Sequence, residues 1–115
     1  IQESTIKESG SYSAKIVKAD FKDFTTFLSS GEHTISVKVK WSGYSGENKP
    51  QLIIKQDKYC GIDSDQVATA TGDGTSWETL SKTITLSKDA EITIRVYARD
   101  IGADALTYFD SLNIT

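Results

Sequence analysis

The sequence is poor in the residues that most catalytic, metal-binding and disulfide-bonded proteins use. Its 115 residues include one cysteine, one histidine, one proline and no methionine. The single Cys60 cannot form an internal disulfide, so the fold must depend on hydrophobic burial. His33 and Cys60 are far apart in sequence, and a nucleophile–base pair would also need a third, orienting group that the sequence does not show. These absences predict a protein that is not an enzyme.

Long apolar runs and an excess of basic residues are also absent. No stretch approaches the roughly 18 apolar residues that span a bilayer, so no membrane span is expected. The 13 basic and 16 acidic side chains give a net charge of −3 and are scattered along the chain. Nucleic-acid binding needs a concentrated basic surface, so no nucleic-acid partner is expected. The chain starts at Ile1 without a signal peptide or an initiator methionine, which favours a processed chain or an excised segment.

The abundant residues favour β-strands. Ser and Thr together number 27, and Ile and Val number 17 against six Leu. β-Branched and aromatic side chains fit a pleated, half-buried surface. Alternation with a period of two is clearest in 34–41, where Trp41 shares the inward phase of three β-branched residues. Further strands are expected at 12–16, irregularly around 21–27, and at 51–56, 66–70, 77–86, 90–99 and 106–115. Eight strands at this spacing predict one all-β domain over residues 1–115, a sandwich or a barrel.

Four segments carry short motifs in a consistent order along the chain. These segments are Ser9–Ile16, Gly31–Val39, Thr75–Ser81 and Tyr108–Ile114. In that order they resemble an SGxYSxxV strand, a strand of the form aGxxYxvsvxvk, a tWxxls segment and a closing yfDdvxv strand. These four motifs are typical of the jelly-roll carbohydrate-binding modules of families 4, 9, 16 and 22, which are galactose-binding-like β-sandwiches. The resemblance implies an antiparallel jelly roll of about eight strands. It also implies a non-catalytic, extracellular or surface-exposed module that binds a poly- or oligosaccharide.

The N-terminus departs from that family. Its glycine–tyrosine strand usually follows a first strand, whereas only Ile1–Glu8 precede it here. A missing strand leaves an open sheet edge that invites pairing with another chain or domain. The same departure motivates an alternative function, a structural, assembly or adhesion domain of a virion, filament or cell-surface protein.

Glycan recognition needs aromatic planes for stacking and planar polar groups for the hydroxyls. The expected strand 90–99 turns one stripe away from the core, and Arg95, Tyr97 and Arg99 make that stripe the first candidate ligand surface. The alternative is an exposed sheet face with stabilising cross-strand pairs. Other strands supply four candidate helpers, Lys38, Lys40, Gln51 and Lys55.

Three further aromatics are candidates for ligand binding. Tyr44 and Tyr59 fall in expected loops rich in Gly, Ser and charged residues, where exposed rings suit binding and ordinary loop packing is the alternative. Trp77 begins a strand, and it could either stack on a ligand or cap the core.

Asp110 is the candidate metal ligand. The resemblance implies a structural Ca²⁺ held by this aspartate together with backbone oxygens around Ser11. Calcium takes about six to eight oxygen ligands, and part of the usual set would come from the missing first strand. The alternative is that Asp110 accepts backbone N–H groups in a β-bulge.

Overall fold

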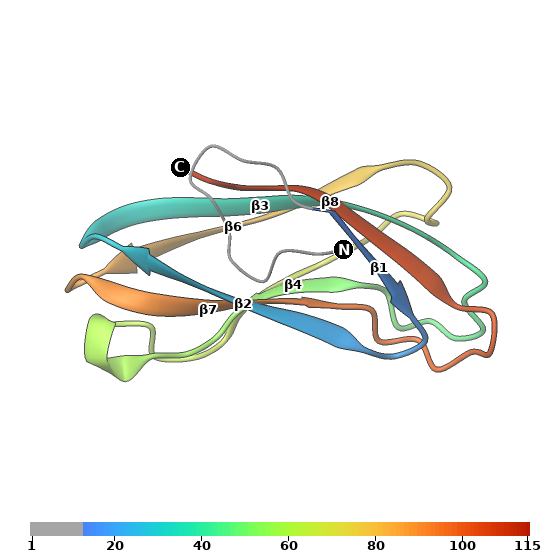
Figure 1. Cartoon of the computed structure of the whole chain (residues 1–115), viewed down its shortest axis with the longest axis horizontal. Helices are drawn as coiled ribbons and strands as arrows, with labels where there is room; N and C mark the ends of the chain where they lie inside the picture. Colours follow the sequence, from blue (N-terminus) through green and yellow to red (C-terminus); the bar gives the residue numbers. More distant parts are fainter. Residues whose placement is uncertain (1–12) are drawn as a thin grey trace.

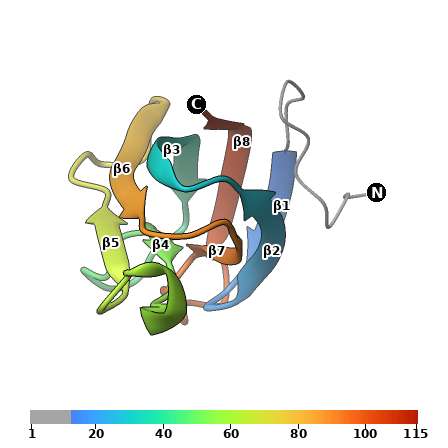
Figure 2. The ribbon, with the colours of Figure 1, turned by 90° about the vertical axis from the view of Figure 1, so that its left-hand side faces the viewer.

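A computed structural model of the chain describes residues 13–115, which form two antiparallel four-stranded sheets packed face to face (Figure 1). The strand orders are β1-β8-β3-β6 and β2-β7-β4-β5, and both layers are visible end-on in Figure 2. The strands are β1 (Ser13–Val17), β2 (Phe21–Leu28), β3 (Gly31–Ser42), β4 (Gln51–Ile54), β5 (Gln66–Thr69), β6 (Glu78–Leu86), β7 (Ala90–Tyr97) and β8 (Leu106–Ile114), with a short 3-10 helix η1 (Lys58–Cys60). The expected antiparallel β-sandwich is confirmed.

Between the sheets lies one hydrophobic core built from the inward phase of each strand. β3 contributes Ile35, Val37 and Val39, all with no exposed surface, and Trp41 at 6% exposure continues the same phase. Phe109 of β8 packs into the same core. The assignment of Trp41 to the core from its period-two phase is therefore confirmed.

β2 differs from the short irregular strand that its three phenylalanines suggested. It is a regular eight-residue strand whose every residue has a register partner on β7. Phe24 is buried at 1% exposure, whereas Phe21 and Phe27 are exposed at 43% and 69%. A three-residue spacing in a strand puts neighbours on opposite faces, so one ring enters the core and two point outward.

β7 ends two residues earlier than expected. Tyr97 is its last residue, and Arg99 has a φ of 69°, in the left-handed region where a strand cannot continue. Arg99 therefore does not continue the line of outward residues from Arg95 to Tyr97.

β1 lies at the edge of its sheet, with β8 as its neighbour. The prediction that a neighbouring chain or domain completes this edge stays a prediction. Ile1–Glu8, the short segment on which the expectation of a missing first strand was based, lies outside the described residues. Within residues 13–115, no helix has the length and apolarity needed to cross a membrane.

Candidate functional site

Each sheet turns one face outward, and the candidate residues divide between these two surfaces. We call the outward side of β2-β7-β4-β5 the β7 face, and the outward side of β1-β8-β3-β6 the β3 face. The outward phase of β7 alternates strictly with its buried phase, which places Arg95 and Tyr97 on the β7 face as the sequence predicted.

Arg95 is held in a fixed orientation on the β7 face. Its Nε and Nη2 donate to Oδ1 and Oδ2 of Asp23 at 2.7 and 2.9 Å, a two-pronged ion pair between β7 and β2. Its guanidinium carbon lies 3.8 Å from the centre of the Phe21 ring. The hydrogen bonds to Asp23 raise the pKa of Arg95. The guanidinium therefore stays charged, while its charge is neutralised by a neighbouring carboxylate.

Aromatic rings complete this cluster. Phe21 and Tyr97 are register partners, and their rings meet edge to face with centroids 6.2 Å apart. Gln51 of β4 is the partner of Tyr97 on the other side, and its Nε2 donates to Oγ1 of Thr69 at 3.0 Å. Ile53, next along β4, is the partner of Arg95. The β7 face thus presents an aromatic pair, a guanidinium and an amide side by side.

The four candidate helpers belong to different surfaces. Gln51 and Lys55 lie on the β7 side, where Lys55 pairs with Asp65 at 2.9 Å. Lys38 and Lys40 lie on β3, in the other sheet. The prediction that Lys38 and Lys40 assist the arginine stripe is therefore wrong, because the whole core separates the two surfaces.

Arg99 is engaged elsewhere. Its Nε donates to the carbonyl oxygen of Lys49 at 2.8 Å, in the segment that leads into β4. The structure therefore joins Arg95 and Tyr97 but turns Arg99 toward a loop.

Tyr44 is half-buried rather than an exposed loop aromatic. Its hydroxyl donates to the carbonyl oxygen of Ala98 at 2.8 Å and shares a hydrogen bond with the buried hydroxyl of Thr107. Its ring packs against Trp41, with centroids 5.9 Å apart. Burial raises the pKa of the Tyr44 phenol. Ordinary loop packing, the alternative left open by the sequence, describes this side chain.

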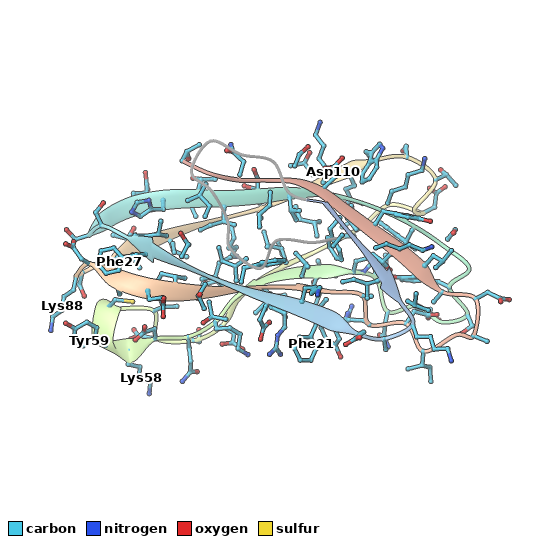
Figure 3. All side chains as sticks on the ribbon, in the orientation of Figure 1. Phe21, Phe27, Lys58, Tyr59, Lys88 and Asp110 are labelled. Atoms are coloured by element: carbon cyan, nitrogen blue, oxygen red, sulfur yellow. The ribbon has the colours of Figure 1, made fainter. Side chains whose placement is uncertain are left out.

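Tyr59 and Trp77 are exposed at 65% and 47%, but neither lies in the Phe21–Tyr97 cluster. Tyr59 is in η1 at one end of the sandwich, the end where Phe27 and Lys88 also lie, and away from Phe21 (Figure 3). The Lys88 ammonium lies 4.5 Å from the centre of the Tyr59 ring. Trp77 directly precedes β6, and the Lys40 ammonium lies 6.0 Å from the centre of its ring.

Asp110 lies at an irregularity of β8, on the layer opposite Phe21 (Figure 3). Its Oδ1 accepts the backbone N–H of Ser111 at 2.8 Å, and Ser111 has a φ of 56°. This is the bulge arrangement that the sequence left as the alternative to calcium. Residues 13–115 hold no group of three acidic, histidine or cysteine side chains suited to a metal. Ser11 lies outside the described residues, so the calcium site stays a prediction.

Asp100 was missed by sequence reasoning. Its buried carboxylate accepts three backbone N–H groups, from Ser45 and Gly46 after β3 and from Gly102, at 2.9 to 3.0 Å. These hydrogen bonds lower the pKa of Asp100. An aspartate 54 residues from its partner gives no local signal of this role. Asp100 therefore links the loop after β7, in one sheet, to the loop after β3, in the other.

A recess of about 400 Å³ lies between the segment after η1 and β6. It is lined mainly by polar residues, among them Asp63, Ser64, Gln66 and Thr83. None of its lining residues is aromatic, so it offers no ring on which a sugar could stack. The cluster on the β7 face is therefore the better candidate site.

Comparison with known proteins supports the fold. No protein-family model matches the chain, and no curated protein matches it in sequence. Among solved structures, a family 16 carbohydrate-binding module superposes with a TM-score of 0.64 at 10% identity, covering 90% of this chain and 76% of its own. A family 4 module gives 0.54 at 22% identity, covering 93% and 71%. A family 61 module solved with β-1,4-galactotriose gives 0.51 at 15% identity, covering 91% and 69%. The chain thus has the jelly-roll fold of carbohydrate-binding modules, as its sequence motifs suggested.

Proposed function

We propose that this chain is a non-catalytic, extracellular or surface-exposed module that binds neutral oligo- or polysaccharides on the β7 face. The observation that carries the proposal is the cluster of Phe21, Tyr97, Arg95 and Asp23. Family 16, 4 and 61 carbohydrate-binding modules share its fold, and one of them was solved with a galactotriose.

Two kinds of contact would hold the sugar. The ring faces and edges of Phe21 and Tyr97 can pack on the C–H surface of a pyranose. Arg95 uses two of its five N–H groups on Asp23, which leaves donors for sugar hydroxyls in an already fixed orientation. A fixed side chain loses little conformational entropy on binding, so its hydrogen bonds contribute more to affinity.

The charge state of the β7 face favours a neutral ligand. Arg95 is paired with Asp23 across β7 and β2, and Lys55, just after β4, is paired with Asp65, just before β5. A charged glycan would have to compete with these carboxylates, whereas hydroxyls can bond to both partners without breaking the pairs.

The described residues also argue for binding rather than catalysis. Cys60 is fully buried, and burial raises the pKa of its thiol, which disfavours the nucleophilic thiolate. The His33 ring is hydrogen-bonded to the carbonyl oxygens of Ser29 and Thr115, so it does not activate Cys60.

Affinity electrophoresis through gels containing neutral β-glucan, xylan, galactan or mannan tests the proposal. The wild-type protein should be retarded in at least one gel. Phe21→Ala and Tyr97→Ala should each weaken binding by roughly two- to tenfold, the range expected for loss of one aromatic contact.

Phe27→Ala is the matched control, because Phe27 is an exposed ring on the same strand but at the other end of that strand, away from Phe21 (Figure 3). It should bind like the wild type. Absence of retardation in every neutral gel would reject the β7 face as a neutral-glycan site, and equal weakening by Phe27→Ala would reject the Phe21–Tyr97 cluster as its centre.

A further inference from the structure

The β3 face carries a row of alternating lysines and aromatic rings. Tyr108 of β8 is the register partner of Lys15 on β1 and of Lys40 on β3. Trp77, just before β6, continues the row, with its ring 6.0 Å from the Lys40 ammonium. Because neighbouring strands lie about 4.8 Å apart, the row crosses the sheet over about 14 Å. Tyr108 and Trp77 are 38% and 47% exposed, so both rings are accessible.

A third lysine broadens this row. Lys38 is the next outward residue on β3, with Thr79 and Asp110 as its register partners. We call Lys15, Lys38, Lys40, Tyr108 and Trp77 the lysine–aromatic row.

The lysines of the row are not neutralised by ion pairs. Within residues 13–115 both salt bridges lie on the β7 side, and neither includes Lys15, Lys38 or Lys40. Asp110 is the acidic residue nearest in register, and one of its oxygens already accepts the N–H of Ser111. Glu32 lies six residues before Lys38 on β3, near the far end of the strand. An excess of positive charge therefore gathers on one surface of a chain whose net charge is −3.

We propose that the lysine–aromatic row is a second binding site, for an anionic polysaccharide whose sugar rings carry carboxylates or sulfates. Trp77 and Tyr108 would stack on the sugar rings, and the three ammonium groups would pair with the anionic substituents. This site lies on the opposite surface from the neutral-glycan site, so either proposal can be rejected without affecting the other.

Charge and shape favour a polysaccharide over other polyanions. Recognition of an anionic membrane typically uses four to eight clustered basic residues, and the row offers three beside Asp110. Nucleic-acid affinity likewise depends on neutralising many phosphates, which an acidic chain with three grouped lysines does poorly. Alternating rings and charges across a sheet instead match a chain of rings with one anion on each.

Affinity electrophoresis of the full chain in gels containing polygalacturonate or dextran sulfate, with neutral dextran as reference, tests this site. Wild-type protein should be retarded by at least one of the two polyanions at low salt and released as salt rises. The triple variant Lys15→Gln/Lys38→Gln/Lys40→Gln should lose about tenfold or more in affinity.

A second triple variant, Lys22→Gln/Lys58→Gln/Lys88→Gln, makes the same change in net charge at exposed lysines elsewhere (Lys58 and Lys88 are at the end of the sandwich in Figure 3). It should stay within about twofold of the wild type. Equal losses of polyanion affinity in the two triple variants would show that only net charge matters, which would overturn the proposed site.

Tryptophan fluorescence gives a readout that does not depend on the lysine variants. Trp41 is buried and Trp77 is exposed, so a polyanion on the row should change the emission of Trp77 and protect it from acrylamide. Trp77→Phe should remove that response. Absence of binding to both polyanions, or tighter binding to phosphatidylserine vesicles or single-stranded DNA, would overturn the assignment.

Discussion

The two outer faces of this sandwich cover the same core but differ in whether their basic side chains form salt bridges. On the β7 face, Arg95 is paired with Asp23 on β2, and Lys55, just after β4, is paired with Asp65, just before β5. On the β3 face, within the described residues, Lys15, Lys38 and Lys40 form no salt bridge. Both faces carry exposed rings. Under the two proposals, these similar aromatic surfaces would bind different ligands, because the charges around the rings are neutralised on one face and unpaired on the other.

Removing a core side chain should produce the largest effect and should affect both faces together. Phe109 has no exposed surface and lies in β8, so Phe109→Ala should destabilise the fold by about 3–5 kcal/mol. Urea unfolding followed by Trp41 fluorescence and by far-UV circular dichroism should show one transition at lower urea. Two separate transitions would mean that the faces do not depend on a common core.

The Asp100 carboxylate should make both faces acid-sensitive at once, since it links the loops after β3 and β7. The folded-state pKa of Asp100 is lowered, so its contribution to stability is present above its unfolded pKa of about 3.9 and is lost as pH falls through the folded pKa. Asp100→Asn should lower the melting temperature at pH 7 and flatten its decline below about pH 4. A melting curve with the same pH dependence as wild type would contradict this role.

Ligand binding on the two faces should differ most clearly in its dependence on ionic strength. Raising ionic strength from about 50 mM to about 500 mM should change neutral-glycan binding on the β7 face by less than about twofold. The same change should weaken polyanion binding on the β3 face by about tenfold or more. Titration calorimetry at the two ionic strengths measures both affinities. A similar salt dependence for the neutral glycan and the polyanion would contradict the difference in charge between the two faces.

The smallest expected effect is the coupling energy of the charge pairs themselves. A double-mutant cycle of Asp23→Asn and Arg95→Gln should give about 0.5 kcal/mol, because the pair is two-pronged but partly exposed. The matched cycle of Asp110→Asn and Lys38→Gln should give a smaller value, since these register partners form no salt bridge. A larger coupling for Lys38 and Asp110 would show that the β3 face is neutralised in solution.

Much of the fold could be predicted because strand formation leaves a local signal. The period-two alternation of 34–41 and 90–99 identified the inward phases of β3 and β7 correctly, including Ala98, although β7 ends at Tyr97. β7 ends before Arg99 because the backbone of Arg99 is in the left-handed region, and no pattern of side chains predicted that conformation.

The candidate site could be predicted only in part. Arg95 and Tyr97 were identified from their outward phase, but Phe21 and Asp23 were not, because they join β7 from more than 70 residues away. Tyr44 was expected on an exposed loop, yet its hydroxyl is fixed by groups 54 and 63 residues away.

By itself, then, the sequence determined that this chain forms strands, which side chains of the clearly alternating strands are buried, and that rings and charges remain outside. Only the tertiary structure decided which outward side chains share a surface. It placed Lys38 and Lys40 with Tyr108 and Trp77, and Arg95 with Phe21 and Asp23. The physical reason is that alternation is a property of each strand alone, whereas strand pairing is selected by the packing of the whole core.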